Sequence, residues 1–172
     1  MLQLSGTLLN QPVLSLRTGA PVAYTLGAIF NPNNLKIEGF YCQDTADRKK
    51  QLVLLSQDIR DVIPQGIVVN DHDALSEPQE LVRLRSIMDL QFQLIGKQVV
   101  TSSKEKIGKV SDYATDVSSM FVQKLYVSQS FLKNLSGGNL GIDRTQIIEL
   151  TNKQIIINDL QERVPARAGA MA

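Results

Sequence analysis

The chain contains two copies of one sequence pattern, and this internal repeat restricts the possible folds more than any other feature. Residues 67–71 read Ile-Val-Val-Asn-Asp, and residues 155–159 read Ile-Ile-Ile-Asn-Asp, 88 positions later. The same spacing of 88 places Ile59 on Ile147. Self-similarity at a fixed spacing indicates that a supersecondary unit has been duplicated. We therefore predict a tandem duplication.

Further pairs extend the alignment at slightly different spacings, which predicts small loop insertions in one copy. They are Val22 with Val110 at 88, Tyr41 with Tyr126 at 85, and Gly6 with Gly96 at 90. In the same alignment Cys42 lies opposite Val127. Because that position belongs to a predicted buried strand, we expect the Cys42 thiol to be an inert core group rather than a nucleophile.

Length and composition narrow the class of protein. A chain of 172 residues fits one or two domains. A net charge of +1 gives no overall field that would attract nucleic acid or an anionic membrane. The single cysteine excludes an intramolecular disulfide. The first residues lack the features of a signal peptide, and no apolar run is long enough for a membrane span. We expect a soluble, cytoplasmic protein without a membrane span.

Short segments rich in β-branched, aromatic or alternating residues are separated by turn signals throughout both copies. The predicted strands are residues 1–9, 22–30, 36–41, 52–55, 61–63 and 67–69 in the first copy, and 109–116, 121–127, 140–143, 148–150 and 155–157 in the second. Many short strands with regular turns favour a small barrel or sandwich. Closure into barrels would also remove exposed strand edges.

One amphipathic helix is predicted between the copies, over residues 76–89. Ser76 and Gln79 have the spacing of a capping box, with Pro78 in the first turn. The helix is expected to pack its apolar stripe on one or both copies, or alternatively to expose it as a ridge for a partner. The stripe consists of Leu81, Leu84, Ile87 and Met88.

Several segments of the second copy follow one another in a recognisable order. They are Gly-Lys-Gln-Val-Val at residues 96–100, Lys-Ile-Gly-Lys-Val-Ser-Asp at 106–112, Gln-Lys-Leu-Tyr-Val at 123–127, Ile-Ile-Glu at 147–149 and residues 155–159. This series resembles the PRC-barrel family, which is named for the H subunit of the photosynthetic reaction centre and includes the C-terminal domain of a ribosome maturation factor. The first copy resembles the family more loosely, with Gly-Ala-Pro-Val at residues 19–22 in place of a Gly-Lys-Val turn and Tyr24 opposite Asp112.

The resemblance implies a mainly β protein made of two tandem small PRC-like β-barrels joined by one amphipathic α-helix. The expected boundaries are residues 1–74 for the divergent first copy, 75–92 for the linker helix, 93–161 for the second copy and 162–172 for a flexible tail. Barrels of this family act mostly as adaptor modules, with no shared catalytic residues or cofactor. We therefore expect a non-enzymatic adaptor that binds a protein partner, with a ribosome- or RNA-associated maturation factor as the alternative.

Some residues of the repeat are expected to serve the fold. Gly96 and Gly108 would allow tight turns or close backbone approach at barrel corners, with Gly6 as the first-copy counterpart. The Asp112 carboxylate would tie a turn together by accepting backbone hydrogen bonds. The recurring pair Asp71 and Asp159 would terminate matching strands.

An apolar loop and a set of basic residues are the candidate partner-binding features. Phe131, Leu132 and Leu135 lie in a loop beside Lys124 and Lys133, and form a docking surface unless the loop folds back over the barrel end. Arg83, Arg85, Lys104, Lys106 and Lys109 would join Lys124 and Lys133 in a basic patch, or else be solvated surface residues. Aromatic residues total only 5%, so an RNA platform built on stacking has little support.

Other candidate sites are weaker. His72 stands between Asp71 and Asp73, but neighbouring residues of a strand point to opposite faces, which disfavours a metal site. The glycine-rich residues 136–141 lack the Gly-Lys-Ser/Thr of a phosphate loop. An enzyme or small-ligand binder would need a deep pocket with convergent polar groups between the copies.

Overall fold

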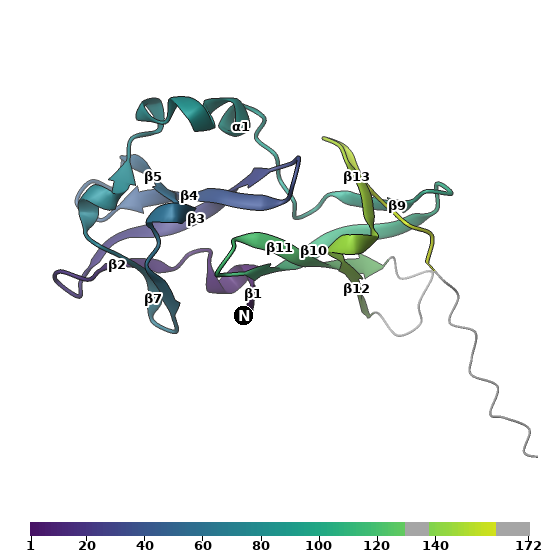
Figure 1. The fold of residues 1–172 in the computed structure, drawn as a ribbon, viewed down its shortest axis with the longest axis horizontal. Helices are drawn as coiled ribbons and strands as arrows, with labels where there is room; N and C mark the ends of the chain where they lie inside the picture. Colours follow the sequence, from purple (N-terminus) through teal and green to yellow (C-terminus); the bar gives the residue numbers. More distant parts are fainter. Residues whose placement is uncertain (130–137, 161–172) are drawn as a thin grey trace, which may run out of the picture.

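The computed structural model describes residues 1–129 and 138–160, and the chain is mainly β, as predicted. Its strands form one 14-stranded sheet in an elongated molecule (Figure 1). The first copy comprises β2 (Pro12–Ser15), β3 (Pro21–Asn31), β4 (Lys36–Asp44), β5 (Gln51–Leu55), β6 (Asp61–Ile63), β7 (Gly66–Val69) and β8 (Leu75–Ser76). The second copy comprises β9 (Gln98–Thr101), β10 (Lys106–Asp116), β11 (Phe121–Gln129), β12 (Asn139–Asp143), β13 (Ile147–Leu150) and β14 (Gln154–Ile157).

The two copies repeat the same order of elements. A long hairpin is followed by a short strand, a 3-10 turn and a second hairpin, the turns being η2 (Ser56–Asp58) and η6 (Arg144–Gln146). In each copy the first strand pairs in parallel with the last strand of the second hairpin, β2 with β7 and β9 with β14, so that Val13 lies opposite Ile67 and Val99 opposite Ile155. The repeated segments at residues 67–71 and 155–159 therefore occupy equivalent places.

In the long hairpins, however, the spacing between equivalent residues is 85 rather than 88. The Thr25 amide donates to the Gln11 carbonyl (2.9 Å), and the Val110 amide donates to the Lys97 carbonyl (3.0 Å). Thr25 is thus the counterpart of Val110, and the predicted match of Val22 with Val110 is wrong.

The match of Gly6 with Gly96 is also wrong. Asn10 donates its amide to the Thr25 carbonyl (2.8 Å), as Gly96 does to the Val110 carbonyl (2.8 Å). Both residues have positive φ angles, 56° at Asn10 and 86° at Gly96. Asparagine and glycine are the residues that tolerate this conformation, so the turn is shared although the residue type is not.

A pairing of β4 with β11 joins the copies. Lys36 lies opposite Phe121, its own counterpart at a spacing of 85. Beside this pair the Ile37 amide donates to the Met120 carbonyl (2.8 Å), and the Val122 amide donates to the Leu35 carbonyl (3.0 Å). These two hydrogen bonds connect equivalent residues in opposite directions, which is the pattern of a two-fold axis. The buried apolar residues of both copies form one continuous core.

Two closed barrels are not observed. In the described part of the chain, β6 and β8 of the first copy each pair with a single neighbour, as do β12 and β13 of the second. The sheet is therefore open at these strands. The PRC-like closure expected from the sequence is not confirmed.

The linker between the copies is not the continuous helix predicted over residues 76–89. It contains the 3-10 turns η4 (Pro78–Glu80) and η5 (Val82–Leu84) and the five-residue helix α1 (Arg85–Asp89). The predicted capping box is absent, because Ser76 pairs with Val53 in β8 and the cap position is held by Glu77, whose side chain forms no capping hydrogen bond. Within residues 1–129 and 138–160, no helix has the length and apolar character to cross a membrane.

The N-terminal segment crosses from the first copy to the second. Within residues 1–9, only β1 (Leu2–Leu4) is a strand, and it is followed by the 3-10 turn η1 (Ser5–Thr7). Strand β1 pairs with β10, so that Gln3 lies opposite Thr115. The terminal amine of Met1 forms an ion pair with Asp116 (2.9 Å). The predicted strand over residues 1–9 is thus much shorter in the structure.

Candidate functional site

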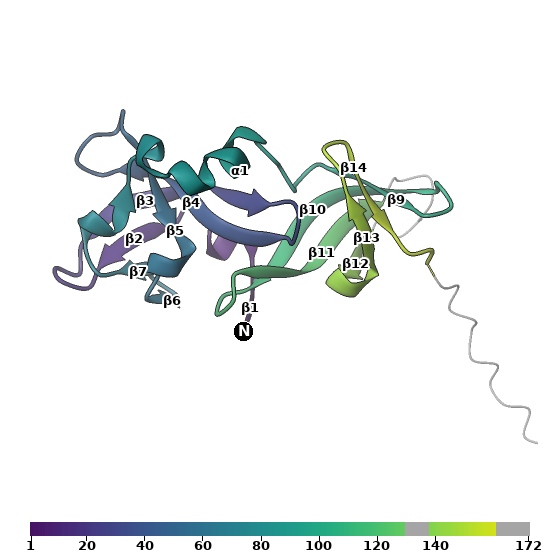
Figure 2. The same ribbon diagram turned by 45° about the horizontal axis from the view of Figure 1, so that its top comes forward.

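A groove of about 730 Å³ lies between the two copies. Its volume falls in the range of about 300–1,000 Å³ that is usual for ligand sites. Figure 2 shows α1 and the segment after it passing over β3 and β4 towards β9. We call this space the inter-copy groove; its lining residues are Leu9, Gly27, Ala28, Phe30, Tyr41, Gln51, Gln91, Phe92, Gln93, Leu94, Ile95 and Tyr113.

Small residues on β3 leave room for the groove. Gly27 and Ala28 occupy the positions that Asp112 and Tyr113 occupy in the second copy, at a spacing of 85. A Cβ atom on Gly27 would meet nothing within 4 Å. The counterpart of Asp112 is therefore Gly27. The sequence alignment placed Tyr24 opposite Asp112, and that match is wrong.

In the second copy, Asp112 occupies the position that Gly27 leaves open. Its Oδ1 accepts hydrogen bonds from the Ser5 amide (3.3 Å) and the Tyr113 amide (2.8 Å). This carboxylate thus ties η1 to β10 through backbone donors, which is the structural role that the sequence predicted for Asp112.

Neutral polar side chains surround an apolar floor in the inter-copy groove. Gln51, Gln91 and Gln93 are exposed, and each amide group can both donate and accept hydrogen bonds. On the floor, the rings of Phe30 and Tyr113 meet edge-on at a centroid distance of 5.3 Å, and Phe92 lies 6.3 Å from Phe30. No side chain of Lys, Arg, His, Asp or Glu is among the lining residues.

The two tyrosines of the groove stay neutral. Burial and the charge of Asp89 on α1 raise the pKa of Tyr41. Burial and the charge of Asp112 raise the pKa of Tyr113. The Tyr113 hydroxyl is fully buried and has no hydrogen-bond partner in the described part of the chain, and the same is true of Thr115. The groove therefore offers the Tyr41 side chain and the glutamine amides, all without net charge.

Comparison with protein families and with curated protein sequences found no match for this chain. Its function is therefore inferred from the residues and their geometry.

Four of the predicted partner-binding residues belong to the segment 130–137. Phe131, Leu132, Leu135 and Lys133 lie outside the described residues. Lys124 is half-buried on β11, with its Nζ 6.0 Å from the Tyr126 ring centre.

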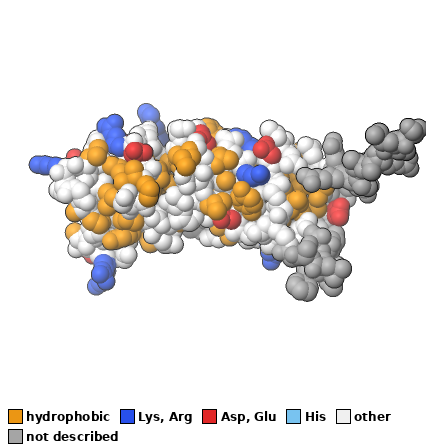
Figure 3. Space-filling view, turned by 90° about the horizontal axis from the view of Figure 1, so that it is seen from below, with side chains coloured by type: hydrophobic (Ala, Val, Ile, Leu, Met, Phe, Trp, Pro, Cys, Tyr) orange, Lys and Arg blue, Asp and Glu red, His pale blue; other side chains and the backbone are white. Residues whose placement is uncertain are grey.

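The basic residues are dispersed. Arg83 on η5 and Arg85 on α1 are exposed above the first copy, whereas Lys106 and Lys109 belong to β10 of the second. On the face seen in Figure 3, Lys and Arg side chains are scattered and form no continuous patch.

The structure gives different reasons for the three predicted glycines. At Gly108, φ is +157° and a Cβ atom would lie 2.0 Å from the Ser128 carbonyl oxygen, so a side chain cannot fit. Gly96 has a φ of +86° in an open turn. A Cβ on Gly6 would meet nothing within 4 Å, so Gly6 has no steric requirement for glycine.

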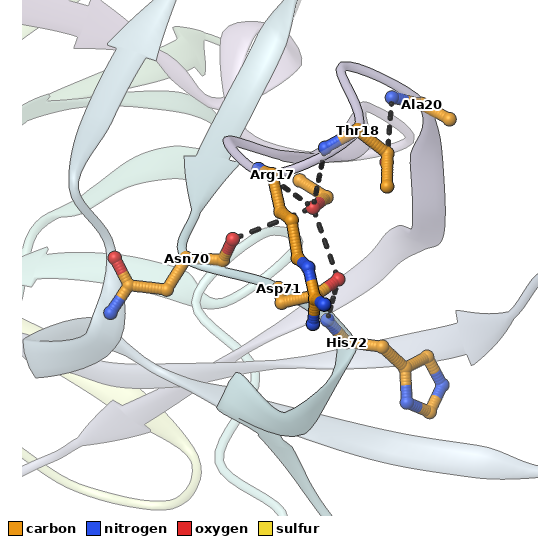
Figure 4. Close-up of polar contacts among 7 residues, drawn as sticks. Arg17, Thr18, Ala20, Asn70, Asp71 and His72 are labelled. Atoms are coloured by element: carbon orange, nitrogen blue, oxygen red, sulfur yellow. Dashed lines mark hydrogen bonds and ion pairs between the residues drawn. The ribbon is translucent and has the colours of Figure 1, made fainter.

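Asp71 and Asp159 have the same structural task in the two copies. Asp71 accepts hydrogen bonds from the Ser15 hydroxyl (3.0 Å) and the His72 amide (2.9 Å), and Arg17 lies at 3.5 Å (Figure 4). Asp159 accepts from the hydroxyls of Ser102 (3.0 Å) and Ser103. These hydrogen bonds lower the pKa of both carboxyl groups. Each aspartate fixes the loop after the first strand of its copy.

His72 and Cys42 occupy structural positions. The imidazole of His72 points away from Asp71 (Figure 4), and its Nε2 lies 3.3 Å from the buried Asp44. No cluster of three metal-ligating side chains exists within the residues that the structure describes. Cys42 lies fully buried on β4, where burial raises the pKa of its thiol to about 12.

Sequence reasoning missed the groove residues. The strongest available signal was the alternation Gln-Phe-Gln-Leu-Ile at residues 91–95, where Gln91, Gln93 and Ile95 are exposed and Phe92 and Leu94 are buried. Such alternation indicates an extended segment with one buried face. The sequence prediction instead placed a helix over residues 76–89 and no site in residues 91–95.

Proposed function

We propose that this protein is a non-enzymatic adaptor that holds an uncharged segment of a protein partner in the inter-copy groove. The lining of the groove carries this proposal. Glutamine amides can match the donors and acceptors of a peptide backbone, while Phe30 and Phe92 can cover an apolar side chain. A groove without charged residues suits a neutral segment, because a charged one would lose its hydration without gaining a partner.

We also propose that the two copies derive from PRC-barrel-like units. The repeated order of strands and the resemblance of residues 96–112 and 147–159 support this origin. We propose that the protein functions in a reducing compartment such as the cytoplasm, and the buried free thiol of Cys42 is compatible with this location.

The alternative, a ribosome- or RNA-associated factor, would require gathered cations for phosphates and exposed rings for bases. Arg83 and Arg85 lie far along the chain from the lysines of β10, on separate elements. Sedimentation with ribosomal subunits at low salt tests this alternative. The adaptor proposal predicts no co-sedimentation, and binding that falls steeply as salt rises would contradict it.

Site-specific photo-crosslinking in the native cell tests the proposal itself. A benzophenone amino acid replaces Gln51 or Gln93 in the groove, and Asp61 on the distant β6 in a control variant. The proposal predicts that both groove positions capture the same protein and that the control does not. Failure to capture protein at either groove position, with a metabolite or RNA recovered on the purified chain instead, would contradict it.

A further inference from the structure

Strand β3 lacks a neighbour at the place where its counterpart β10 has one. Strand β10 is flanked on its outer side by β9 at its beginning and by β1 at its end. Strand β3 is flanked by β2 at its beginning, with Pro12 opposite Tyr24. In the described part of the chain, no strand follows along residues 28–31 on that side.

The hydrogen bonds of β4 show which backbone groups face this free edge. The Ile37 amide donates to Met120 and its carbonyl accepts from the Ser56 hydroxyl (2.7 Å), so both groups point away from β3. Phe30 lies opposite Ile37 and must also point its amide and carbonyl away from the ladder, towards the free edge. Ala28, two residues earlier on the same strand, points the same way.

The other wall of the groove is also an unpaired, extended backbone. Residues 92–94 belong to no strand, and their side chains alternate between buried and exposed. Within residues 92–94, only the Leu94 carbonyl forms a backbone–backbone hydrogen bond in the described chain, accepting from the Lys97 amide (3.3 Å). The amide and carbonyl groups of Phe92 and Gln93, which both line the groove, therefore have no backbone partners within the described residues.

The linker does not fill the place that β1 fills in the second copy. By the spacing of 86 that relates β2 to β9, Leu2 and Leu4 correspond to Met88 and Leu90, at the end of α1. Helix α1 instead lies over β3 and β4, where the charge of Asp89 reaches Tyr41 on β4. The edge of β3 thus lacks the strand that its equivalent has.

We infer that the inter-copy groove binds an extended strand of a partner protein, added to the free edge of β3 at Ala28 and Phe30. This mode rests on the proposed adaptor function and specifies how the partner is held. In strand addition, backbone hydrogen bonds supply affinity and alternate side chains supply specificity. The strand fitting here is uncharged, with aliphatic residues at alternate positions, as in the Leu-Gln-Leu of β1 on the equivalent edge.

A second copy of this chain is the poorer candidate for the occupant. Its β1 is already paired with its own β10, and its terminal amine is held by Asp116. Removing β1 from that site would expose the β10 edge again, so the exchange gains nothing. A partner of different sequence faces no such cost.

The test uses a peptide with blocked ends that copies residues 1–5, Met-Leu-Gln-Leu-Ser, as a strand probe. Amide hydrogen exchange is followed by NMR in the full chain. The inference predicts that the peptide slows exchange at Ala28 and Phe30. Two further peptides carry N-methyl groups on alternate amides, one on the odd-numbered and one on the even-numbered residues. One of them should lose the effect and the other should keep it, because a strand pairs through every second residue.

Two matched variants locate the site. Gly27→Asp places a carboxylate in the groove, and Gly6→Asp places one at an equally open position on η1. We expect Gly27→Asp to weaken peptide binding at least about tenfold, equivalent to about 1.4 kcal/mol, and Gly6→Asp to leave it unchanged. Equal effects of both variants, or no slowed exchange at the highest soluble peptide concentration, would overturn the inference.

The outcomes also separate this inference from the adaptor proposal. If crosslinking from Gln93 captures a partner but that partner leaves exchange at Ala28 and Phe30 unchanged, strand addition is wrong and the adaptor function stands. A bound second copy, recognised by doubled mass in sedimentation, would equally overturn the inferred occupant.

Discussion

Single residues decide where the two copies differ. Asp112 and Tyr113 fill a position in the second copy that Gly27 and Ala28 leave open in the first. The sequence contained this difference, but the alignment at a spacing of 88 hid it by placing Tyr24 opposite Asp112. The error arose because the loops of the copies differ in length, and a one-dimensional alignment cannot tell which loop holds the extra residues.

The buried hydroxyls of Tyr113 and Thr115 provide a first prediction. Neither hydroxyl has a partner in the described chain, and an unsatisfied buried polar group costs about 1–3 kcal/mol. Tyr113→Phe and Thr115→Val should therefore leave stability unchanged or raise it by about 1 kcal/mol in urea unfolding. A loss of more than about 1 kcal/mol in both variants would show that these hydroxyls are satisfied.

Gly108 and Gly27 form a matched pair for a second prediction. Gly108→Ala should destabilise the protein by at least about 2 kcal/mol, since the new Cβ would collide with the Ser128 carbonyl at an unfavourable φ. Gly27→Ala should change stability by less than about 1 kcal/mol, because the space there is open. Chemical denaturation of both variants checks this, and similar losses would contradict the steric account.

Asp71 and Asp159 give a prediction about pH. Their pKa values are lowered in the folded state, so they stabilise it at pH values above the ordinary aspartate pKa of about 3.9. That stabilisation is lost as pH falls through the lowered values. Unfolding measured from pH 6 to pH 3 should show stability falling, and Asp71→Asn with Asp159→Asn should flatten the curve. An unchanged slope in the double variant would contradict the assignment.

At the scale of elements, the hairpins at residues 61–69 and 148–157 could be predicted because their signals are local. The linker could not. Leu81, Leu84 and Ile87 recur every third residue, a spacing that fits a 3-10 turn as well as an α-helix. The sequence predicts Ser76 as a helix cap, but its backbone pairs with Val53, a contact that depends on a strand distant in the chain.

The junction of β4 and β11 supplies a prediction at this scale. Arg144 on η6 donates to the carbonyls of Asn34 (2.6 Å) and Val122 (3.3 Å) and stacks over Phe121 at 4.8 Å, so it links the copies. Arg144→Ala should destabilise the protein by about 1–3 kcal/mol. The exposed Arg83→Ala should change stability by less than about 0.5 kcal/mol. Thermal unfolding of both variants measures the difference, and equal effects would refute this role.

At the scale of the whole molecule, the mainly β fold and its duplication follow from the sequence, whereas the shared sheet does not. The apolar positions of each copy indicated a core, but nothing local could indicate that the Phe30 and Tyr113 rings would meet across the copies. The floor of the groove depends on this contact between the two rings. It also depends on β1, which leaves the first copy to pair with β10 and so makes the edges of β3 and β10 unequal.

Amide hydrogen exchange of the free protein tests this inequality most directly. Phe30 and Thr115 are equivalent residues, but Thr115 is paired with β1 and Phe30 faces the free edge of β3. The amide of Phe30 should therefore exchange at least about tenfold faster than that of Thr115. Equal protection of the two amides would mean that the edge of β3 is already occupied. The groove could then not bind a partner strand at this edge.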